Sequence, residues 1–367
     1  MKVMVADKNA YPLKLQLKSG EVFEGLCPFD IKDLHFGEIV FNTGMVGYTE
    51  TLTDPSYKGQ IVTFTYPIMG NYGVANKDTW ESDKIQAAGV IVCTVCDEPN
   101  RSFSEQSLID WCKESNVPLI YGIDTRALTK VIRDKGATPA VIANVKSNIK
   151  ANEFVDINEQ DLAAQVCVKE PTIIKDGKYK LIVVDCGTKQ NILRHLSSDN
   201  FDFEIKVVPY DYDYSNDDYD GLFLSNGPGD PAICKQTIAI LKKTIENKIK
   251  KPIFGICLGS QIMGLAIGAK TYKMPFGHRA QNHPCLEIKT DKCFLTSQNH
   301  GFAIKPETIP SSWEVSFKNL NDQSVAGLKH KTLPYSSVQF HPEANPGPVD
   351  TAYLFNKFYE DVIAYKK

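Results

Sequence analysis

Hydrophobic and polar positions alternate over short segments of the first 145 residues, as they do in strands that bury one face. In "PLKLQLKSGEVFEG" the alternation runs on both sides of residues 18–21, which predicts a hairpin with Gly20 in its turn. "GQIVTFTYP" and "AAGVIVCTVC" are two further strand candidates. We therefore expect residues 1–145 to form a mixed, strand-rich N-terminal domain.

One helix in this half is marked at both ends. In "DTRALTKVIRDKG", Asp124 is placed to cap the N-terminus and Gly136 to close the C-terminus. Leu128, Val131 and Ile132 share the face that is expected to be buried. The chain then becomes polar, and we expect a linker at residues 146–179.

After residue 180, continuous apolar runs alternate with helical segments. "KLIVVDCG", "FEIKVVPY", "YDGLFLSNGPGD" and "KPIFGI" predict buried strands, and helical patterns such as "LGSQIMGLAIG" stand between or after them. Such alternation predicts an α/β domain at residues 180–367, with a largely parallel sheet flanked by helices on both faces. Ligands of these folds bind at the carboxyl ends of the strands, where the loops "SNGPGDP" and "GICLGSQ" are expected.

Composition narrows the class of protein. A length of 367 residues suits two domains, and no apolar run approaches the ~20 residues that cross a bilayer. The formal net charge of −3 gives no basic surface for nucleic acid. The ten cysteines are spread through a chain too long to need a disulfide framework, so we expect reduced thiols. The N-terminal segment does not resemble a signal peptide, and a cytoplasmic protein is expected.

Residues 255–259, Gly-Ile-Cys-Leu-Gly, have the spacing of a nucleophile elbow, with cysteine where many hydrolases place serine. A nucleophile on a sharp strand-to-helix turn needs neighbours without side chains two residues away, and the glycines provide them. The start of the following helix favours a thiolate on Cys257, and the N–H of Leu258 is directed at an oxyanion formed there. The competing interpretation is a buried structural cysteine.

His341 is the candidate base for this thiol. It follows the apolar strand "YSSVQF", and Glu343 is placed to accept the proton of the far ring nitrogen and fix the tautomer. The sequence therefore predicts a triad of Cys257, His341 and Glu343. The competing interpretation of the H-P-E sequence is a surface turn.

The other six histidines are weaker candidates. His35 lies in the N-terminal domain, and His195 and His330 are expected in a helix and a charged loop. Spacing alone leaves open the three that remain in the C-terminal domain: His278, His283 and His300.

Four further motifs carry weaker signals. "LSNGPGDP" predicts a rigid loop whose Gly229 N–H is placed to be a second oxyanion donor, although Gly-Pro loops are usually only turns. "SQNHGF", residues 297–302, is a polar cluster. Cys93 and Cys96 have metal or redox spacing, but they lie in a strand pattern without a second pair, so buried thiols are favoured. The acidic run 210–220 suggests a cation site or, as we favour, a solvated loop.

Together, the elbow, the H-P-E turn and the "NGPGDP" loop resemble those of class I (triad) glutamine amidotransferases. "FNTGMVGYTETLTDPSYKGQIVTFTYPIMGNYG", "IDTRALTK", "LSNGPGDP", "GAKTYKMPFGHRAQNHP", "SQNHGFAI" and "HPEANPGP" are similar to the glutaminase (small) subunits of carbamoyl phosphate synthetases, or to the matching region of fused enzymes. The likeness covers nearly the whole chain, and its first-domain stretch is specific to this family.

The resemblance implies that Cys257 attacks the side-chain amide of L-glutamine, while His341 carries the proton to ammonia and Glu343 orients the imidazole. It implies that backbone N–H groups of Leu258 and Gly229 hold the oxyanion. It also implies a glutamine site with members from both domains: Gly44, Gly227, Gly229, Leu258, Gln261, Asn299, Gly301 and Phe302.

The resemblance implies a partner as well. Ammonia passes to a large synthetase subunit, or to a fused synthetase domain, which uses bicarbonate and two ATP to make carbamoyl phosphate for pyrimidines and arginine. ATP and its metal ion are then expected in that partner, with the N-terminal domain docking onto it. In this chain no cofactor and no metal are expected, and its sequence contains no P-loop.

Two residues depart from the family pattern. Gly44 stands where many bacterial small subunits have a serine that meets the substrate, which leaves only backbone there. Ser260 stands where many relatives have histidine. Because Cys257 is retained, we expect an active enzyme. The alternatives are a non-catalytic docking or regulatory subunit with a vestigial triad, and a stand-alone hydrolase of γ-glutamyl compounds that would leave the first domain unexplained.

Overall fold

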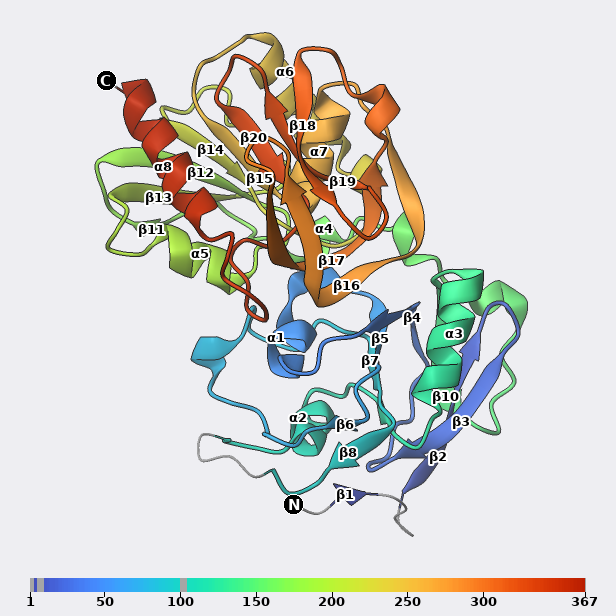
Figure 1. The fold of residues 1–367 in the computed structure, drawn as a ribbon. Helices are drawn as coiled ribbons and strands as arrows, with labels where there is room; N and C mark the ends of the chain where they lie inside the picture. The colour runs from blue at the N-terminus through green and yellow to red at the C-terminus, as the bar shows by residue number, and fades with distance from the viewer. Residues whose placement is uncertain (1–2, 5–9, 100–103, 367) are drawn as a thin grey trace. The chain divides into compact units, whose positions relative to one another are not determined.

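A computed structural model describes residues 3–4, 10–99 and 104–366. The chain folds into two compact units, Met1–Gln160 and Asp161–Lys367. The boundary falls inside the segment that we expected as a linker. Figure 1 follows the first unit from blue to green and the second from green to red. Within the described ranges, no helix combines the length and the apolar character needed to cross a bilayer.

The N-terminal unit contains a seven-stranded mixed sheet of order β3-β2-β10-β4-β5-β7-β9 and a three-stranded sheet of order β1-β8-β6. Its strands are β1 (Val3–Met4), β2 (Tyr11–Leu17), β3 (Val22–Cys27), β4 (His35–Asn42), β5 (Gln60–Phe64), β6 (Ile68–Met69), β7 (Gly89–Ile91), β8 (Thr94–Cys96), β9 (Leu119–Ile120) and β10 (Thr138–Asn144). Its α-helices are α1 (Tyr48–Thr53), α2 (Leu108–Glu114) and α3 (Thr125–Lys135).

The predicted hairpin is confirmed by β2 and β3. The N–H of Leu17 donates to the carbonyl of Glu21 at 2.9 Å, and Gly20 has a φ of 104°, where a side chain would be strained. The alternation along β2 buries Leu13 and Leu15, which confirms the one-sided pattern.

The predicted ends of helix α3 are also confirmed. Asp124 Oδ1 accepts the N–H of Ala127 at 2.9 Å, and Gly136 follows the last helical residue with a φ of 92°. Leu128 and Ile132 are buried on one face, as predicted, whereas Val131 is only half-buried.

The apolar stretch "AAGVIVCTVC" differs from the expectation of one strand. It forms two short strands in different sheets: β7 pairs in parallel with β5 and β9, whereas β8 pairs with β1 and β6. A continuous run of apolar residues does not show where a chain leaves one sheet for another, because both segments are buried.

The C-terminal unit is built on one ten-stranded sheet of order β11-β13-β12-β14-β15-β20-β19-β18-β16-β17. Its strands are β11 (Thr172–Lys175), β12 (Tyr179–Asp185), β13 (Phe203–Pro209), β14 (Gly221–Leu224), β15 (Ile253–Ile256), β16 (Thr271–Glu287), β17 (Lys292–Ile304), β18 (Trp313–Asn319), β19 (Val325–His330) and β20 (Tyr335–Val338). The strands from β13 to β20 in this order are parallel, which confirms the parallel sheet.

Helices cover both faces of the parallel part (Figure 1). The helices are α4 (Ala163–Val166), α5 (Gln190–Leu196), α6 (Lys235–Glu246), α7 (Leu258–Ala266) and α8 (Tyr353–Lys366). Residues of α6 and α7 pack with one set of strand side chains, and residues of α5 and α8 pack with the other. Because successive strand residues point to opposite faces, the continuous apolar runs supply both cores.

Four antiparallel strands extend this sheet on one side, and the sequence did not predict them. The long strands β16 and β17 form a hairpin that joins β18, β19 and β20. His330 belongs to β19 rather than to the charged loop that we expected. The acidic run 210–220 is only partly a solvated loop, because Tyr214 and Tyr219 within it are buried.

Candidate active site

The predicted elbow lies between β15 and α7, and Cys257 has the backbone strain of such a turn. Its φ of 53° and ψ of −104° lie where a residue with a side chain is rarely found. A Cβ on Gly259 would lie 2.4 Å from the Leu224 carbonyl oxygen, and one on Gly255 would lie 2.9 Å from the Gly259 carbonyl. Any side chain at either glycine would therefore push the nucleophile turn away from the sheet.

Main-chain hydrogen bonds hold the elbow against its neighbours. The N–H of Cys257 donates to Val338 at 2.9 Å, and that of Gly259 donates to Ser225 at 3.0 Å. Leu258 is the first residue of α7, where N–H groups have no partner within the helix, and among the described residues none accepts from it. This N–H and the positive end of the helix both stabilise negative charge at the thiol.

His341 and Glu343 are joined by a short hydrogen bond, Nδ1 to Oε1 at 2.6 Å. Both side chains are buried, as is Cys257, so the H-P-E sequence is not a surface turn. With Nδ1 bonded to Glu343, Nε2 is the ring nitrogen that remains for proton transfer. Gln339, two residues before His341, places its Nε2 3.7 Å from Cys257 Sγ, so the thiol and the imidazole belong to one buried site.

Lys189 completes a row of alternating charges. Its Nζ lies 3.1 Å from Glu343 Oε1, and it also donates to the carbonyl of Ala344 at 2.5 Å. The lysine side chain is as buried as its partners, with 3% of its area exposed. A buried ammonium group needs such a counter-charge, so Lys189 and Glu343 stabilise each other.

These charges shift the ionisation of the imidazole and the carboxylate. Burial alone would lower the pKa of His341, but Glu343 and the Cys257 thiolate outweigh it and raise the pKa above the ordinary range. Burial alone would raise the pKa of Glu343, but Lys189 and His341 lower it. The arrangement therefore favours an imidazolium and a carboxylate at neutral pH.

Strand β17 borders the thiol. Cys257 Sγ donates to the Asn299 carbonyl at 3.5 Å, and the N–H of His341 donates to the Ser297 carbonyl at 2.9 Å. Gln261 Nε2 donates to the Phe302 carbonyl at 2.8 Å. One strand thus contacts the nucleophile turn, the base and the first turns of α7.

The structure brings together most residues named for glutamine binding, while their role as ligands stays a prediction. Gln261, Asn299 and Phe302 lie along α7 and β17 beside Cys257, as just described. A Cβ on Gly227 would lie 2.1 Å from the Cys186 carbonyl, and Gly229 has a φ of 89°, so that loop requires both glycines.

The last two members of that set are also glycines. A Cβ on Gly301 would meet only the end of Arg279, at 3.4 Å. Gly44 lies in the N-terminal unit, between β4 and α1, and its N–H donates to Asn42 Oδ1 at 2.7 Å.

Sequence reasoning missed Lys189 and Gln339. Gln339 Nε2 lies 3.7 Å from Cys257 Sγ, and its Oε1 accepts from Gln261 at 3.1 Å. Gln339 stands two residues before His341 in the quoted motif, so its place next to the base was a usable signal. Lys189 offered none, because 155 residues separate it from the carbonyl that it bonds.

The remaining candidates lie elsewhere. Ser260 Oγ bonds Ser337 Oγ at 2.8 Å. Cys96 is a buried thiol whose pKa is raised by its burial, whereas Cys93 is only half-buried, so the expectation of buried thiols is confirmed for Cys96 alone. All ten cysteines are free thiols. Among the described residues, no group of three or more His, Cys, Asp or Glu side chains is arranged to hold a metal ion.

Both units match family models of known proteins. The family model "Carbamoyl-phosphate synthase small chain, CPSase domain" matches residues 15–142, and "Glutamine amidotransferase class-I" matches residues 182–361. The arginine-specific small chain of carbamoyl phosphate synthase from Aspergillus oryzae is 45% identical over 365 residues, which is 95% of this chain and 80% of that protein.

Two longer relatives contain the same region as part of a larger protein. "Multifunctional protein CAD" of Squalus acanthias is 45% identical over 355 residues, and "Multifunctional protein pyr1-3" of Dictyostelium discoideum is 45% identical over 353 residues. The matches cover 94% and 89% of this chain but only 16% of either relative.

Proposed function

The chain belongs to the carbamoyl phosphate synthase small-chain family and carries a class I glutamine amidotransferase domain, and we propose on this basis that it is the glutaminase component of a carbamoyl phosphate synthase. It hydrolyses L-glutamine through a thioester on Cys257 and supplies ammonia for synthesis. The observation that carries this proposal is the buried Cys257 on a strained turn, together with the buried His341 that Glu343 holds through Nδ1.

The first step forms the thioester. The Cys257 thiolate attacks the side-chain amide carbon of glutamine, and the N–H groups of Leu258 and Gly229 stabilise the charge that develops on the carbonyl oxygen. The His341 imidazolium gives its Nε2 proton to the amide nitrogen. The C–N bond breaks, ammonia leaves, and the glutamyl group remains on Sγ.

The second step releases glutamate. A water molecule attacks the thioester carbonyl while His341, now neutral, accepts one of its protons. The C–S bond breaks, the water oxygen remains in the new carboxyl group, and the thiolate is again paired with the imidazolium. Glu343 keeps the imidazole in the tautomer that both steps require, because Nδ1 stays bonded to it.

Glutamine is proposed to bind along α7 and β17. The main chain at Asn299, Gly301 and Phe302 borders the thiol, and Gln261 fixes the Phe302 carbonyl. A buried polar site of this kind distinguishes glutamine from its analogues by hydrogen bonds, because an analogue that lacks the side-chain amide leaves polar groups of the site unpaired. Gly227, in the loop after β14, belongs to the same proposal.

The synthetase is the proposed partner. In the multifunctional relatives the matched region is one part of a longer polypeptide, whereas the small chain of Aspergillus oryzae is matched over most of its length. We propose that a synthetase subunit or domain consumes the ammonia with bicarbonate and ATP, in the cytoplasm, for arginine or pyrimidine synthesis. ATP and its metal ion are assigned to that partner and not to this chain.

A glutamine-like diazoketone tests the glutaminase directly. The purified chain is incubated with the reagent, and adducts are located by intact mass and peptide mapping. One adduct on Cys257, blocked by glutamine and lost in His341→Ala, is expected. Cys293→Ala is the matched control, because it removes an exposed thiol and should leave the adduct unchanged.

The opposite result has a clear meaning. Labelling at other cysteines, or no labelling when a synthetase partner is added, would contradict the glutaminase proposal. Ammonia release from glutamine, measured with and without the partner, then separates an active component from a docking subunit.

A further inference from the structure

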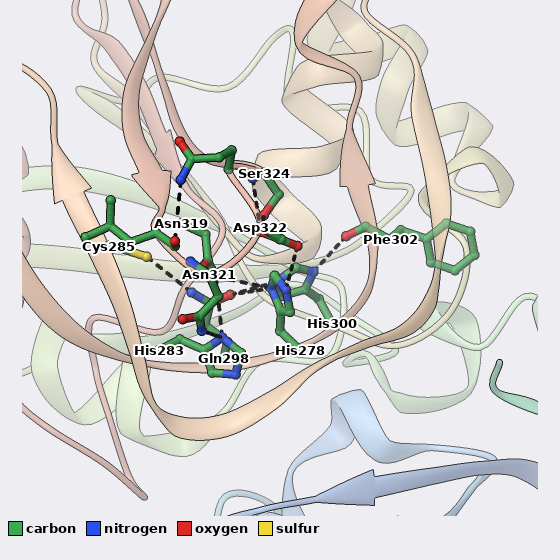
Figure 2. A network of polar contacts seen from close by, with 12 residues as sticks. His278, His283, Cys285, Gln298, His300, Phe302, Asn319, Asn321, Asp322 and Ser324 are labelled. Carbon is green, nitrogen blue, oxygen red and sulfur yellow. Dashed lines mark hydrogen bonds and ion pairs between the residues drawn. The ribbon is translucent and has the colours of Figure 1, made fainter. Parts of the chain in front are cut away.

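A second buried polar cluster lies behind the glutamine site, on β16, β17 and the turn between β18 and β19 (Figure 2). His278, Gln298 and His300 form its centre and are at most 5% exposed. The proposed mechanism uses none of them. Buried polar groups that are not catalytic are retained only where their hydrogen bonds are satisfied, so the network defines a fixed arrangement.

Asp322 sets the direction of this network. One oxygen of its carboxylate accepts the N–H and the hydroxyl of Ser324, and the other lies 2.9 Å from His278 Nε2. A carboxylate accepts only, so the proton of this contact belongs to His278 Nε2. These bonds lower the pKa of Asp322 although burial raises it, and the group stays ionised. Asp322 thereby turns His278 Nδ1 toward the interior.

His278 meets His300 and Gln298 through that nitrogen. Nδ1 lies 3.2 Å from His300 Nε2 and 3.1 Å from Gln298 Oε1. Both of these atoms accept, so the donor of these hydrogen bonds is a second ring proton, on His278 Nδ1. Burial lowers the pKa of His300 well below its ordinary value, so the ring is neutral. Its Nδ1 lies 2.8 Å from the Phe302 carbonyl, which accepts only, and the single proton is therefore on Nδ1.

The far end of the network is the wall of the glutamine site. The Phe302 carbonyl accepts from both His300 Nδ1 and Gln261 Nε2, each at 2.8 Å, so both of its lone pairs are used. Three residues earlier on β17, the Asn299 carbonyl accepts from the Cys257 thiol. Figure 2 shows the contacts running from Asp322 through His278 to His300 and on to Phe302.

We propose that Asp322 and His278 are positioning residues for glutamine binding, which act through His300 on the main chain of residues 299–302. This inference rests on the proposed glutaminase. Asp322 lies at a turn with 38% of its side chain exposed, whereas the carbonyl that it helps to place lies inside the site. Glutamine affinity is thus set partly from the surface of the unit, by a residue that touches neither substrate nor thiol.

We call the contacts from Asp322 through His278 and His300 to the Phe302 carbonyl the relay. Asp322→Ala tests it, with Asp322→Asn as the conservative variant. Asn keeps an oxygen that accepts from His278 Nε2, so it should restore much of the effect. Glu314→Ala is the matched control, because it removes an exposed carboxylate from β18, which pairs with β19, without touching the network. For Asp322→Ala the expected result is a KM for glutamine raised roughly five- to thirtyfold, with kcat changed less than about twofold.

Hydrogen exchange supplies a readout that does not depend on activity. In Asp322→Ala, the amides of residues 299–302 should exchange faster than in the wild type, while Glu314→Ala leaves them unchanged. An unchanged KM and unchanged exchange in folded Asp322→Ala would overturn the inference, as would an Asn variant no better than Ala. If Asp322→Ala does not fold, His278→Gln replaces it with the same expectations. An inactive wild type would instead contradict the proposed glutaminase, and exchange would still decide the relay.

Discussion

Lys189 Nζ lies 3.1 Å from Glu343 Oε1, the same buried carboxylate oxygen that bonds His341 Nδ1. The candidate triad is thus the end of a longer row of groups: the Lys189 ammonium, the Glu343 carboxylate, the His341 imidazolium and the Cys257 thiol. Each charge has an opposite neighbour. Removing one of the charged groups takes a counter-charge away from its buried neighbour.

Lys189→Gln should destabilise the protein by about 3–5 kcal/mol, because it leaves the buried Glu343 without its ammonium partner. In the wild type the folded pKa of Glu343 is lowered, so its stabilisation is present above the unfolded pKa and is lost as pH falls through the folded pKa. In the variant this pKa is less depressed, and the loss should begin at a higher pH. Urea unfolding at several pH values measures both effects. Lys242→Gln, at an exposed lysine of α6, is the control and should change stability little.

The pH profile of glutamine hydrolysis should reflect the raised pKa of His341. The proposed first step needs the imidazolium as proton donor, so the alkaline fall of kcat/KM should lie well above the ordinary histidine value of about 6.5. A fall centred near 6.5 would contradict the charge arrangement.

The raised pKa of His341 also makes stability depend on pH. The stabilisation from the imidazolium is fully present below the unfolded pKa and is lost as pH rises through the folded pKa. Unfolding of His341→Asn should therefore differ most from the wild type at neutral and acidic pH.

Gly259→Ala should destabilise the elbow by about 1–3 kcal/mol or more and abolish Cys257 labelling. The new Cβ would lie 2.4 Å from the Leu224 carbonyl oxygen, which is main chain and does not move aside cheaply. Gly301→Ala is the control for folding, because its Cβ meets only a flexible arginine end at 3.4 Å. Thermal unfolding measures the stability of both variants. Equal stability of Gly259→Ala and Gly301→Ala would refute the steric argument.

Ser260→Ala should cost about 1–3 kcal/mol in stability, because it leaves the buried Ser337 hydroxyl without its 2.8 Å partner. Activity should stay within about twofold of the wild type, since the Ser260 hydroxyl bonds β20 and not the thiol. Steady-state hydrolysis and denaturant unfolding measure the two quantities separately. A large loss of kcat without a loss of stability would assign Ser260 a role in the reaction.

The sequence predicted those parts of the fold whose signals are local. Each strand from β12 to β15 is one apolar run, and α3 and the β2–β3 hairpin carry their own capping or turn residues. Strands β16 and β17 were not predicted, because their buried face carries polar side chains such as Gln298 and His300. Hydrophobic alternation is invisible where a strand buries a hydrogen-bonded network instead of apolar groups.

The residues of the candidate site also divide into those with a local sequence signal and those without one. Cys257, His341 and Glu343 stand in short motifs whose spacing itself implies a turn, a base and its orienting group. Lys189 and Asp322 stand in stretches without such spacing, and their roles exist only through contacts between distant segments. Burial of charge, which is the reason for both contacts, is a property of the folded chain and has no local sequence pattern.

The main-chain ties of the elbow and of the H-P-E turn have a consequence for protein engineering. Cys257 is tied to Val338 on β20, and His341 is tied to Ser297 on β17, in both cases through backbone atoms. The spacing of the reactive pair is therefore a property of three strands, β15, β17 and β20, and not of the two motifs that carry the pair. A graft that moved only the motifs to another scaffold would transfer the reactive groups without their geometry, whereas a chimera that exchanged the three strands as one cassette would carry the geometry with it.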